Sequence, residues 1–403
     1  MQQQKSNNSE RQGKVSVIRQ TLIFRKNKMN YLHQIYARIF GDGGGSRDYS
    51  IAPKHDFSCT PPKILTFGNV LLDHTAHLES QEILKRHKLS LNARAELDVE
   101  TLTKVTNEAI GESKEEAHLG GSALNTSRIL KKLGTDPMFF GAIGDDKQAH
   151  LVQDLLHKAD LNSCHYRLQT ITDTPTGRCI CLVYKNSLAL YANIGASSKF
   201  STDFLKKFER EDYNAPFLRS PEKKQIIYIE GFFVPQREDV ITFIVRNYVK
   251  GRRYLAMNLS ANYIVKLNYH HMLYLANHAL FIFGNKDEFE TFRECWGASN
   301  IEELAKGLVQ DGATAKVLVI TKGSEGVQMI TNFVDEQSPP SELTYQTFAA
   351  TRAENVVDTT GCGDAFAAAF LHYWLDKRSL TECVRFANDI AAKVAGQIGC
   401  NLP

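Results

Sequence analysis

Short apolar runs alternate along the chain with segments of helical period. The apolar runs are rich in Val, Ile and Phe, which is typical of buried strands in a parallel sheet. They are Ile64–Phe67, Met138–Ala142, Ile226–Ile229, Tyr254–Leu259, Ala279–Phe283, Val317–Thr321 and Val327–Thr331. Helical spacing lies between several of them, as in Ser122–Leu133 and Ala365–Leu375. The alternation predicts an α/β fold with a doubly wound, mostly parallel sheet.

Two parts of the chain depart from this alternation. Residues 178–184 and 187–192 have the pattern of two short strands, and Lys185-Asn186 lies between them as a turn. The segment from Asp73 to about His118 also fits the βα alternation poorly. We therefore predict a small β lid that projects from the main domain, with segments near 73–118 and 178–192.

The first 62 residues differ from the rest in composition. Among residues 1–40, many Lys and Arg side chains accompany a single acid, Glu10, and a glycine-rich linker follows at residues 41–46. We interpret residues 1–62 as a basic, flexible extension and residues 63–403 as one folded domain. A mitochondrial transit peptide is the alternative interpretation of such a leader. We expect a cytoplasmic protein, with the nucleus or the mitochondrion as alternatives.

Charge and hydropathy narrow the classes of function. The formal net charge is +3, from 48 basic and 45 acidic residues, so neither nucleic acid nor a membrane surface is expected as the main partner. No apolar run approaches the ~18 residues that a spanning helix needs. Apolar residues make up 43% of the chain, which suffices for a sizeable core. The composition favours a globular protein that acts on small molecules.

The strongest local signal is the glycine turn at residues 358–366. A β-like run leads through Asp358 into Gly361 and Gly363, and a helix of small residues follows. Backbone N–H groups at such a helix start could bind a transferring phosphoryl group, with the amides of Gly361, Cys362 and Gly363 as the anion hole. Asp364 would lie in the first helical turn, where it could accept a proton from an attacking hydroxyl. A plain helix-capping role for Asp364 is the alternative.

Four further turns join a strand to a helix or a loop. Residues 118–125 contain Gly121, with Ser122 and Asn125 at the start of a helix, and residues 66–73 end in Asp73. Asn285 and Glu288 lie three apart after a strand, so both could hold Mg²⁺ through water. Residues 320–326 could border a nucleotide. For each turn the alternative is an ordinary cap or turn. No G-x-x-x-x-G-K-[ST] sequence occurs, which excludes a P-loop enzyme.

Taken in order, these turns resemble the signatures of the ribokinase-like (PfkB) carbohydrate kinases. The segment 358–366 resembles their C-terminal signature, residues 120–125 their N-terminal glycine motif, and Asn285 with Glu288 their magnesium-associated motif. Gly231-Phe232-Phe233 and Asn258-Leu259-Ser260-Ala261 resemble the branch that phosphorylates adenosine. The resemblance covers roughly residues 63–403 and implies a Rossmann-like domain with a β lid. It also implies transfer of the ATP γ-phosphoryl group to the ribose 5′-hydroxyl.

The resemblance also implies roles for individual residues. Asp364 is expected as the general base. The expected nucleoside-binding residues are Asn69, Asp73, Gly121, Ser122, Asn125, Cys179, Ile194 and Phe232, with Asp73, Gly121 and Asn125 at the ribose and Ser122, Cys179, Ile194 and Phe232 near the base. The expected residues on the ATP side are Asn285, Thr321, Gly323, Asp358 and Asn388. Family members need ATP and Mg²⁺, and some respond to K⁺. We expect a monomer whose partners are a nucleoside and ATP.

The chain departs from the family pattern at several positions. Thr360 and Cys362 replace Asn and Ala in the C-terminal signature, and a thiol at a helix start predicts a lowered pKa for Cys362. Arg94 and Glu96 fall where the family lines its base pocket with Gln and Leu, and an Arg expected after the 185–187 turn is missing. Two alternatives therefore stay open: another sugar or nucleoside kinase of the family, or a catalytically weak relative that binds nucleoside.

Overall fold

The structure of the chain is a computed structural model. It describes residues 61–91, 93–111, 117–185, 187–212, 215, 223–310 and 314–403. The predicted basic extension lies outside the described residues up to residue 60, as does Asn186 of the predicted turn.

The main sheet has nine strands, within the described part of the chain, in the order β14-β13-β12-β11-β10-β9-β1-β5-β6. The strands from β12 to β6 are parallel, and β13 and β14 continue the sheet in antiparallel pairing. The strands, in chain order, are β1 (Ile64–Phe67), β5 (Pro137–Gly144), β6 (Tyr166–Ile171), β9 (Gln225–Glu230), β10 (Arg253–Asn258), β11 (Ala279–Asn285), β12 (Val317–Thr321), β13 (Val327–Thr331) and β14 (Thr344–Phe348). The prediction of a mostly parallel sheet is confirmed.

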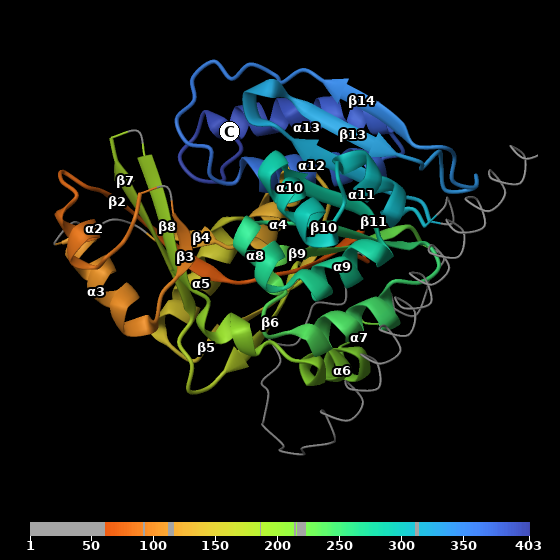
Figure 1. Ribbon diagram of the computed structural model, residues 1–403. Coiled ribbons are helices and arrows are strands. Elements are labelled where there is room, and N and C mark those ends of the chain that lie inside the picture. The colour runs from red at the N-terminus through yellow and green to blue at the C-terminus, as the bar shows by residue number, and fades with distance from the viewer. Residues whose placement is uncertain are drawn as a thin grey trace, which may run out of the picture. The chain divides into compact units, whose positions relative to one another are not determined.

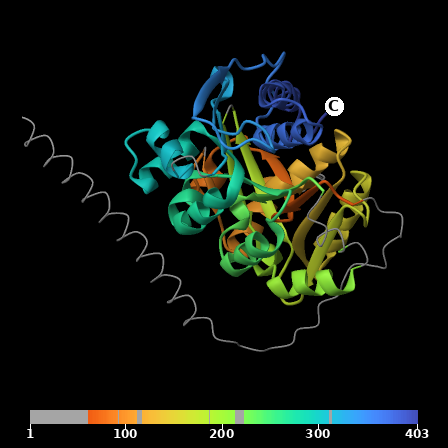
Figure 2. The ribbon, with the colours of Figure 1, turned by 90° about the vertical axis from the view of Figure 1, so that its right-hand side faces the viewer.

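Helices cover both faces of this sheet, as Figures 1 and 2 show. On one face lie α6 (Thr202–Glu211), α7 (Glu238–Tyr248), α8 (Asn262–Leu267), α9 (Tyr269–His278), α10 (Lys286–Trp296) and α11 (Ile301–Leu308). On the other lie α4 (Ser122–Lys132), α5 (Lys147–Lys158), α12 (Cys362–Leu375) and α13 (Leu380–Ala395). Alternate residues of one strand enter different cores: Leu65 packs on the first face and Ile64 on the second. The doubly wound prediction is confirmed.

Helix α12, which starts at the glycine turn, is packed on several sides. It contacts both α4 and α13, and the run Ala365–Leu371 is buried throughout. Ser379 and Glu382 form a capping box at the start of α13, which fixes the end of the α12–α13 connection. The first turn of α12 is thereby held in place by its neighbours.

A second sheet of five strands, again among the described residues, has the order β3-β8-β7-β2-β4. Its strands are β2 (Leu71–His77), β3 (Arg94–Glu96), β4 (His118–Gly120), β7 (Gly177–Tyr184) and β8 (Ser187–Asn193). Together with α2 (Glu82–Arg86) and α3 (Val99–Ile110) we call it the lid. The lid lies at one end of the main sheet, as Figure 1 shows. Its own small core includes Leu102, Val105 and Ile180.

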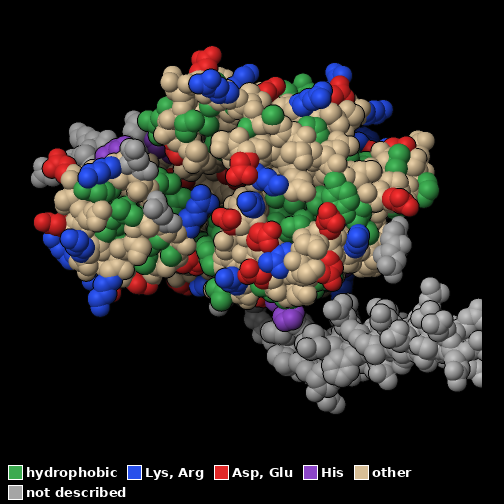
Figure 3. Space-filling view, turned by 45° about the horizontal axis from the view of Figure 1, so that its top comes forward, with side chains coloured by type: hydrophobic (Ala, Val, Ile, Leu, Met, Phe, Trp, Pro, Cys, Tyr) green, Lys and Arg blue, Asp and Glu red, His purple; other side chains and the backbone are tan. Residues whose placement is uncertain are grey.

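The surface shows mixed charge. On the face drawn in Figure 3, basic and acidic side chains are interspersed over the described residues. Among those residues, no helix has both the length and the apolar character that crossing a membrane would require.

Candidate active site

A cavity of about 320 Å³ lies where the lid meets the carboxyl ends of the main strands. Parallel α/β sheets bind ligands at this edge. The end of β9 contributes Glu230, the end of β11 contributes Asn285, and the end of β12 contributes Thr321. The lid contributes Arg94, Glu96, Cys179, Leu190 and Ala192, and the start of α12 contributes Gly361, Gly363 and Asp364.

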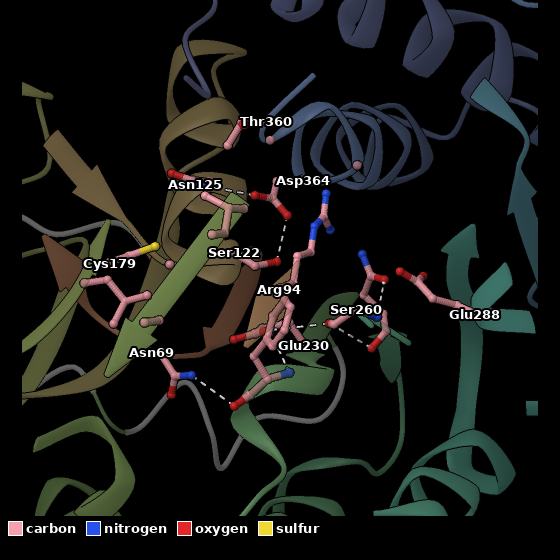
Figure 4. Close-up of a pocket in the computed structure, with 18 of the residues that line it drawn as sticks. Asn69, Arg94, Ser122, Asn125, Cys179, Glu230, Ser260, Glu288, Thr360 and Asp364 are labelled. Carbon is pink, nitrogen blue, oxygen red and sulfur yellow. Dashed lines mark hydrogen bonds between the residues drawn. The ribbon is translucent and has the colours of Figure 1, made fainter. Parts of the chain in front are cut away.

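Asp364 lies in the first turn of α12 and accepts two side-chain hydrogen bonds from α4. Ser122 Oγ donates to Oδ1 at 2.7 Å, and Asn125 Nδ2 donates to Oδ2 at 3.0 Å. Figure 4 shows both bonds and the carboxylate between the two donors. Two fixed donors leave the carboxylate with one orientation, facing the cavity that it lines.

The surroundings of Asp364 tune its proton affinity. Burial raises the pKa of Asp364 from 3.8 to about 6, while the hydrogen bonds from Ser122 and Asn125 and the charge of Arg94 lower the pKa and limit the rise. The carboxylate is therefore mostly ionised at neutral pH. A base with a pKa just below the working pH combines the correct protonation state with a useful affinity for the proton.

The start of α12 offers backbone N–H groups beside this carboxylate. Gly361 is the N-cap and has the left-handed angles φ 77° and ψ 0°. A Cβ on Gly361 would lie 2.2 Å from Cβ of Cys400, so the turn needs glycine for space as well as for conformation. The α12 N-terminus has no side-chain cap. The Cys362 N–H donates to the carbonyl of Thr359 at 3.2 Å, and the N–H groups of Gly361 and Gly363 can bind an anion. A proton acceptor and an anion site thus lie within one helical turn.

Two hydrogen-bond acceptors without partners also line the cavity, one on β2 of the lid and one between β1 and β2. Asp73 Oδ1 and Asn69 Oδ1 are both buried and have no partner among the described residues. Asn69 is oriented by its Nδ2, which donates to the carbonyl of Phe232 at 2.9 Å. Burial raises the pKa of Asp73 to about 7, although Arg128 lowers it. Buried acceptors without donors are costly, and hydroxyl groups of a ligand would satisfy them.

Glu230 is a third buried acid at the cavity. Its Oε2 accepts from the Phe232 N–H at 2.9 Å, and Ser260 Oγ lies 3.4 Å from the same oxygen. Its Oε1 has no partner in the described part of the chain. Burial, with the charge of Asp364 second, raises the pKa of Glu230 to about 8, so this carboxyl is largely protonated at neutral pH. Glu230 can then donate as well as accept.

Comparison with known proteins identifies the family. The model of the pfkB family carbohydrate kinases matches residues 90–403, which is well over half of the chain. The chain belongs to the pfkB family of carbohydrate kinases. Adenosine kinase 2 of Arabidopsis thaliana is 26% identical over 349 residues, which cover 84% of this chain and 95% of that protein.

Solved structures show the same fold for this pfkB-family chain. Adenosine kinase of Anopheles gambiae, in complex with P1,P4-di(adenosine-5) tetraphosphate, superposes with a TM-score of 0.69 at 23% identity, covering 84% of this chain and 96% of that one. A probable sugar kinase of Rhizobium etli also superposes with a TM-score of 0.69, at 21% identity, covering 85% of this chain and 96% of that one. At this identity the two likenesses establish the pfkB-family fold alone.

The structure brings most of the expected pfkB-family site residues together. Those that line the cavity are Asn69, Asp73, Gly121, Ser122, Asn125, Cys179, Ile194, Phe232, Asn285, Glu288, Thr321, Gly361, Gly363 and Asp364. They come from both sheets and from the starts of α4, α10 and α12. The roles assigned to them by resemblance stay predictions, but their convergence on one cavity is a finding.

Four expected residues lie outside the cavity. Asp358 accepts from the N–H groups of Thr360 and Gly399, both at 2.8 Å, and so shapes the loop before α12. Asn388 Nδ2 donates to the carbonyl of Ala349 at 3.1 Å. Gly323 lies in a short 3₁₀ turn with φ 56°, and Cys362 is the fourth. For Asp358 and Asn388 the structure shows contacts within the protein.

The prediction of a lowered pKa for Cys362 is wrong. Burial, together with the charges of Asp358 and Asp364, raises the pKa of the Cys362 thiol to about 11. Its Sγ lies 3.6 Å from the carbonyl of Ala391 on α13. The favourable field of a helix start is outweighed here because burial disfavours the thiolate and two carboxyl groups repel it. The thiolate form of Cys362 is therefore disfavoured, and its backbone N–H donates to the carbonyl of Thr359 at 3.2 Å.

Two residues of α4 have contacts that the resemblance does not imply. Ser122, expected near the nucleoside base, instead donates to Asp364. Asn125, expected at the ribose, also donates to Asp364, and its Oδ1 accepts from Arg128 at 3.2 Å. One N–H of the Asn125 amide remains for a ligand. Both residues therefore position the carboxylate of Asp364.

Asn285 and Glu288 form a capping box at the start of α10. Asn285 Oδ1 accepts from the Glu288 N–H at 2.9 Å, and Glu288 Oε2 accepts from the Asn285 N–H at 2.9 Å. Glu288 Oε1 accepts from Asn285 Nδ2 at 2.7 Å. The described residues contain no cluster of three or more His, Cys, Asp or Glu side chains suited to a metal. The capping interpretation is therefore confirmed, and remaining lone pairs on Glu288 fit an ion held through water.

Glu230, Asn258 and Ser260 were not predicted as site residues, although they line the cavity. A signal existed for Glu230. It is a charged residue directly after the apolar run Ile226–Ile229, at the carboxyl end of a parallel strand, where ligands bind. Asn258 ends the neighbouring strand β10 in the same way.

Proposed function

We propose that this chain is an adenosine kinase, which transfers the γ-phosphoryl group of ATP to the 5′-hydroxyl of adenosine. One observation supports it most strongly. A fixed carboxylate with a raised pKa, Asp364, and the uncapped N-terminus of α12 line the same cavity as the partnerless acceptors Asn69 and Asp73. The names of relatives that match over nearly their whole length support adenosine as the acceptor.

The transfer step assigns a task to each group. The 5′-oxygen forms a bond to the γ-phosphorus while the bond from that phosphorus to the bridging oxygen of ADP breaks. The proton of the 5′-hydroxyl passes to Asp364, and the products are AMP and ADP. The amides of Gly361 and Gly363 bind the phosphoryl oxygens, on which negative charge is spread during transfer. The Cys362 amide takes part once it exchanges its bond to the Thr359 carbonyl for a phosphoryl oxygen. The Ser122 and Asn125 hydrogen bonds keep the carboxylate aimed at the hydroxyl.

The ribose occupies the lid side in this proposal. Its vicinal hydroxyls donate to Asp73 Oδ1 and Asn69 Oδ1, the two buried acceptors that have no partner within the described residues. Each such bond replaces an unsatisfied buried group, which contributes about 1–3 kcal/mol. With the vicinal hydroxyls bound there, the 5′-hydroxyl at the other end of the ribose can reach Asp364, which lines the same cavity.

ATP and Mg²⁺ are the cofactors of the proposed reaction. Thr321 and Asn285, at the ends of β12 and β11, lie on the side of the cavity that the resemblance assigns to ATP. Mg²⁺ bound to ATP neutralises phosphate charge, and Glu288 is the carboxylate placed to bind its water ligands. A stimulating K⁺ is also part of the proposal. The protein is proposed to act as a monomer.

A second candidate is a kinase of the same family with another acceptor. Arg94 and Glu96 of β3 line the cavity, and the resemblance expects uncharged side chains there. Glu96 is exposed in part, and its partial burial in the cavity raises its pKa, while the charge of Arg237 lowers it. Charged groups at this wall could select a more polar acceptor than adenosine.

Product analysis separates the candidates. The purified full chain is incubated with Mg-ATP and one acceptor at a time: adenosine, guanosine, cytidine, ribose or fructose. Formation of AMP from adenosine, with a much higher kcat/KM than for the other acceptors, is expected. Turnover of a sugar alone would reject the adenosine proposal and retain the family. Adenosine binding by calorimetry without turnover would favour a binding protein.

A further inference from the structure

The cavity has an unusual balance of charge for a site that holds a nucleoside triphosphate. Five carboxyl groups of the described residues line it: Asp73, Glu96, Glu230, Glu288 and Asp364. Among the described residues that line it, Arg94 is the sole Lys, Arg or His. The phosphate chain of ATP is strongly anionic, so a group with positive charge is needed beside it.

Arg94 is positioned on the lid and not on the main domain. It is the first of three residues in β3, an edge strand that pairs with β8 alone among the described strands, and Arg94 lies opposite Leu190 in the register. All three β3 residues are exposed to solvent. The Arg94 side chain extends from the lid toward Asp364, as Figure 4 shows.

The guanidinium acts on the catalytic region without being bonded to it. Its charge lowers the pKa of Asp364 and of Glu288, so it lies within electrostatic reach of both. Within the described part of the chain, however, the Arg94 side chain has neither a hydrogen bond nor an ion pair. The five N–H donors of its planar fork are therefore available to a ligand.

The anion that fits between these groups is the phosphoryl group in transfer. The amides at the start of α12 approach it from one side, beside Asp364. Arg94 approaches from the lid, and its fork matches the geometry of phosphate oxygens better than a point charge does. A nucleoside carries no negative charge that the Arg94 guanidinium could bind.

We propose that Arg94 binds the transferring phosphoryl group from the lid side, so that the lid supplies the positive charge that the main domain does not. The inference rests on the proposed function, because it assumes a phosphotransferase site. It makes Arg94 a catalytic residue, and it explains how a charged side chain can occupy a wall where the family resemblance expects an uncharged one.

The test compares Arg94→Ala and Arg94→Lys with the control Arg86→Ala. Arg86 is also an exposed arginine of the lid, but it pairs with Glu108 and does not line the cavity. Steady-state rates with adenosine and Mg-ATP are measured for the full chain. Arg94→Ala is expected to lower kcat by ~10²–10³-fold, as for loss of a transition-state donor. Arg94→Lys should recover part of kcat, and Arg86→Ala should leave it unchanged.

A binding measurement tests the same contact without turnover. Calorimetry gives the affinities for ADP and for AMP-PNP, an ATP analogue with an intact γ-phosphate, both with adenosine and Mg²⁺ present. Arg94→Ala should weaken AMP-PNP binding by ~10–100-fold, the value of a hydrogen bond to a charged group, and leave ADP binding nearly unchanged. The thermal midpoint of unfolding should be that of the wild type, because Arg94 is exposed.

The outcomes separate the two claims. An unchanged kcat, or an AMP-PNP to ADP affinity ratio equal to that of the wild type, would overturn the role of Arg94. A change confined to the KM for the nucleoside would also overturn it and make Arg94 a contact of the nucleoside base. If the wild type phosphorylates no acceptor, the proposed function fails, and the affinity ratio still decides whether Arg94 binds the γ-phosphate.

Discussion

Ser122 donates a hydrogen bond to Asp364, with 2.7 Å between Oγ and Oδ1, although 242 positions separate the two residues in the chain. The bond joins the start of α4 to the start of α12, and the two helices pack against each other. Two glycine turns that are distant in the sequence thus form one site. A bond to the ionised carboxylate stabilises that form, so Ser122 affects the pKa of the proposed base.

The pH dependence of activity tests this relationship. Because the base acts when ionised, kcat/KM for adenosine should rise with pH through the pKa of Asp364, about 6. Ser122→Ala removes a bond to the carboxylate, so the pKa should rise and the acid limb should move to higher pH. Ser299→Ala, an exposed serine outside the cavity, is the control. An acid limb at the same pH in Ser122→Ala and in the wild type would contradict the assignment of Asp364 as the base.

Asp73 should matter to nucleoside binding more than to chemistry. Asp73→Ala removes a buried acceptor proposed to bind a ribose hydroxyl, and the KM for adenosine should increase by ~10–100-fold. The KM for ATP should change little. The control is Glu79→Ala, because Glu79 is an exposed acid of the same region that does not line the cavity. An unchanged nucleoside KM in Asp73→Ala would show that the ribose is bound elsewhere.

Two glycines of the α12 turn should respond differently to the same change. Gly361→Ala places a Cβ 2.2 Å from Cβ of Cys400 at φ 77°, so both folding stability and activity should fall. A Cβ on Gly363 meets nothing within 4 Å, and alanine favours a helix over glycine by about 1 kcal/mol. Gly363→Ala should therefore keep the thermal midpoint and lose kcat, because the methyl group enters the anion site. Equal loss of stability in both variants would contradict this separation.

Glu230 should make the protein less stable as pH rises. Burial raises its pKa from 4.5 to about 8, so its favourable contribution is complete below pH 4.5 and is lost as pH rises through about 8. Glu230→Gln imitates the protonated carboxyl, so the free energy of unfolding should fall less with rising pH in this variant. The free energy of unfolding in urea is compared at about pH 5 and about pH 8 for both proteins. An equal decrease in the free energy of unfolding between the two pH values, in the wild type and in Glu230→Gln, would mean that Glu230 is ionised in the folded protein.

The fold could be predicted from the sequence to a large extent because apolar periodicity reports buried strands directly. Ile64–Phe67, Val317–Thr321 and Val327–Thr331 match β1, β12 and β13 residue for residue. The other predicted strands of the main sheet differ by one or two residues at an end, as at β5, whereas β6 and β14 were not predicted. Local sequence patterns suffice to predict the matching strands because tertiary packing and intrinsic propensity favour the same secondary structure there.

The site was less predictable, because its chemistry depends on contacts between distant segments. Nothing local shows that Ser122 and Asn125 donate to Asp364, or that burial and two carboxyl groups raise the pKa of Cys362. The capping box at the start of α10 is local, and there the plain structural alternative proved correct. The resemblance placed Arg94 at the wall of the base pocket, but only the structure shows that its side chain extends toward Asp364.

The most direct test of the proposed mechanism is the turnover of Asp364→Asn with adenosine and Mg-ATP, beside calorimetric binding of both substrates. Asp376→Asn, at the opposite end of α12, is the matched control. Asp364→Asn is expected to lose ~10²–10⁴-fold or more in kcat and still bind adenosine and ATP, because the variant lacks only the proton acceptor. Turnover close to that of the wild type would contradict the central claim that Asp364 is the general base.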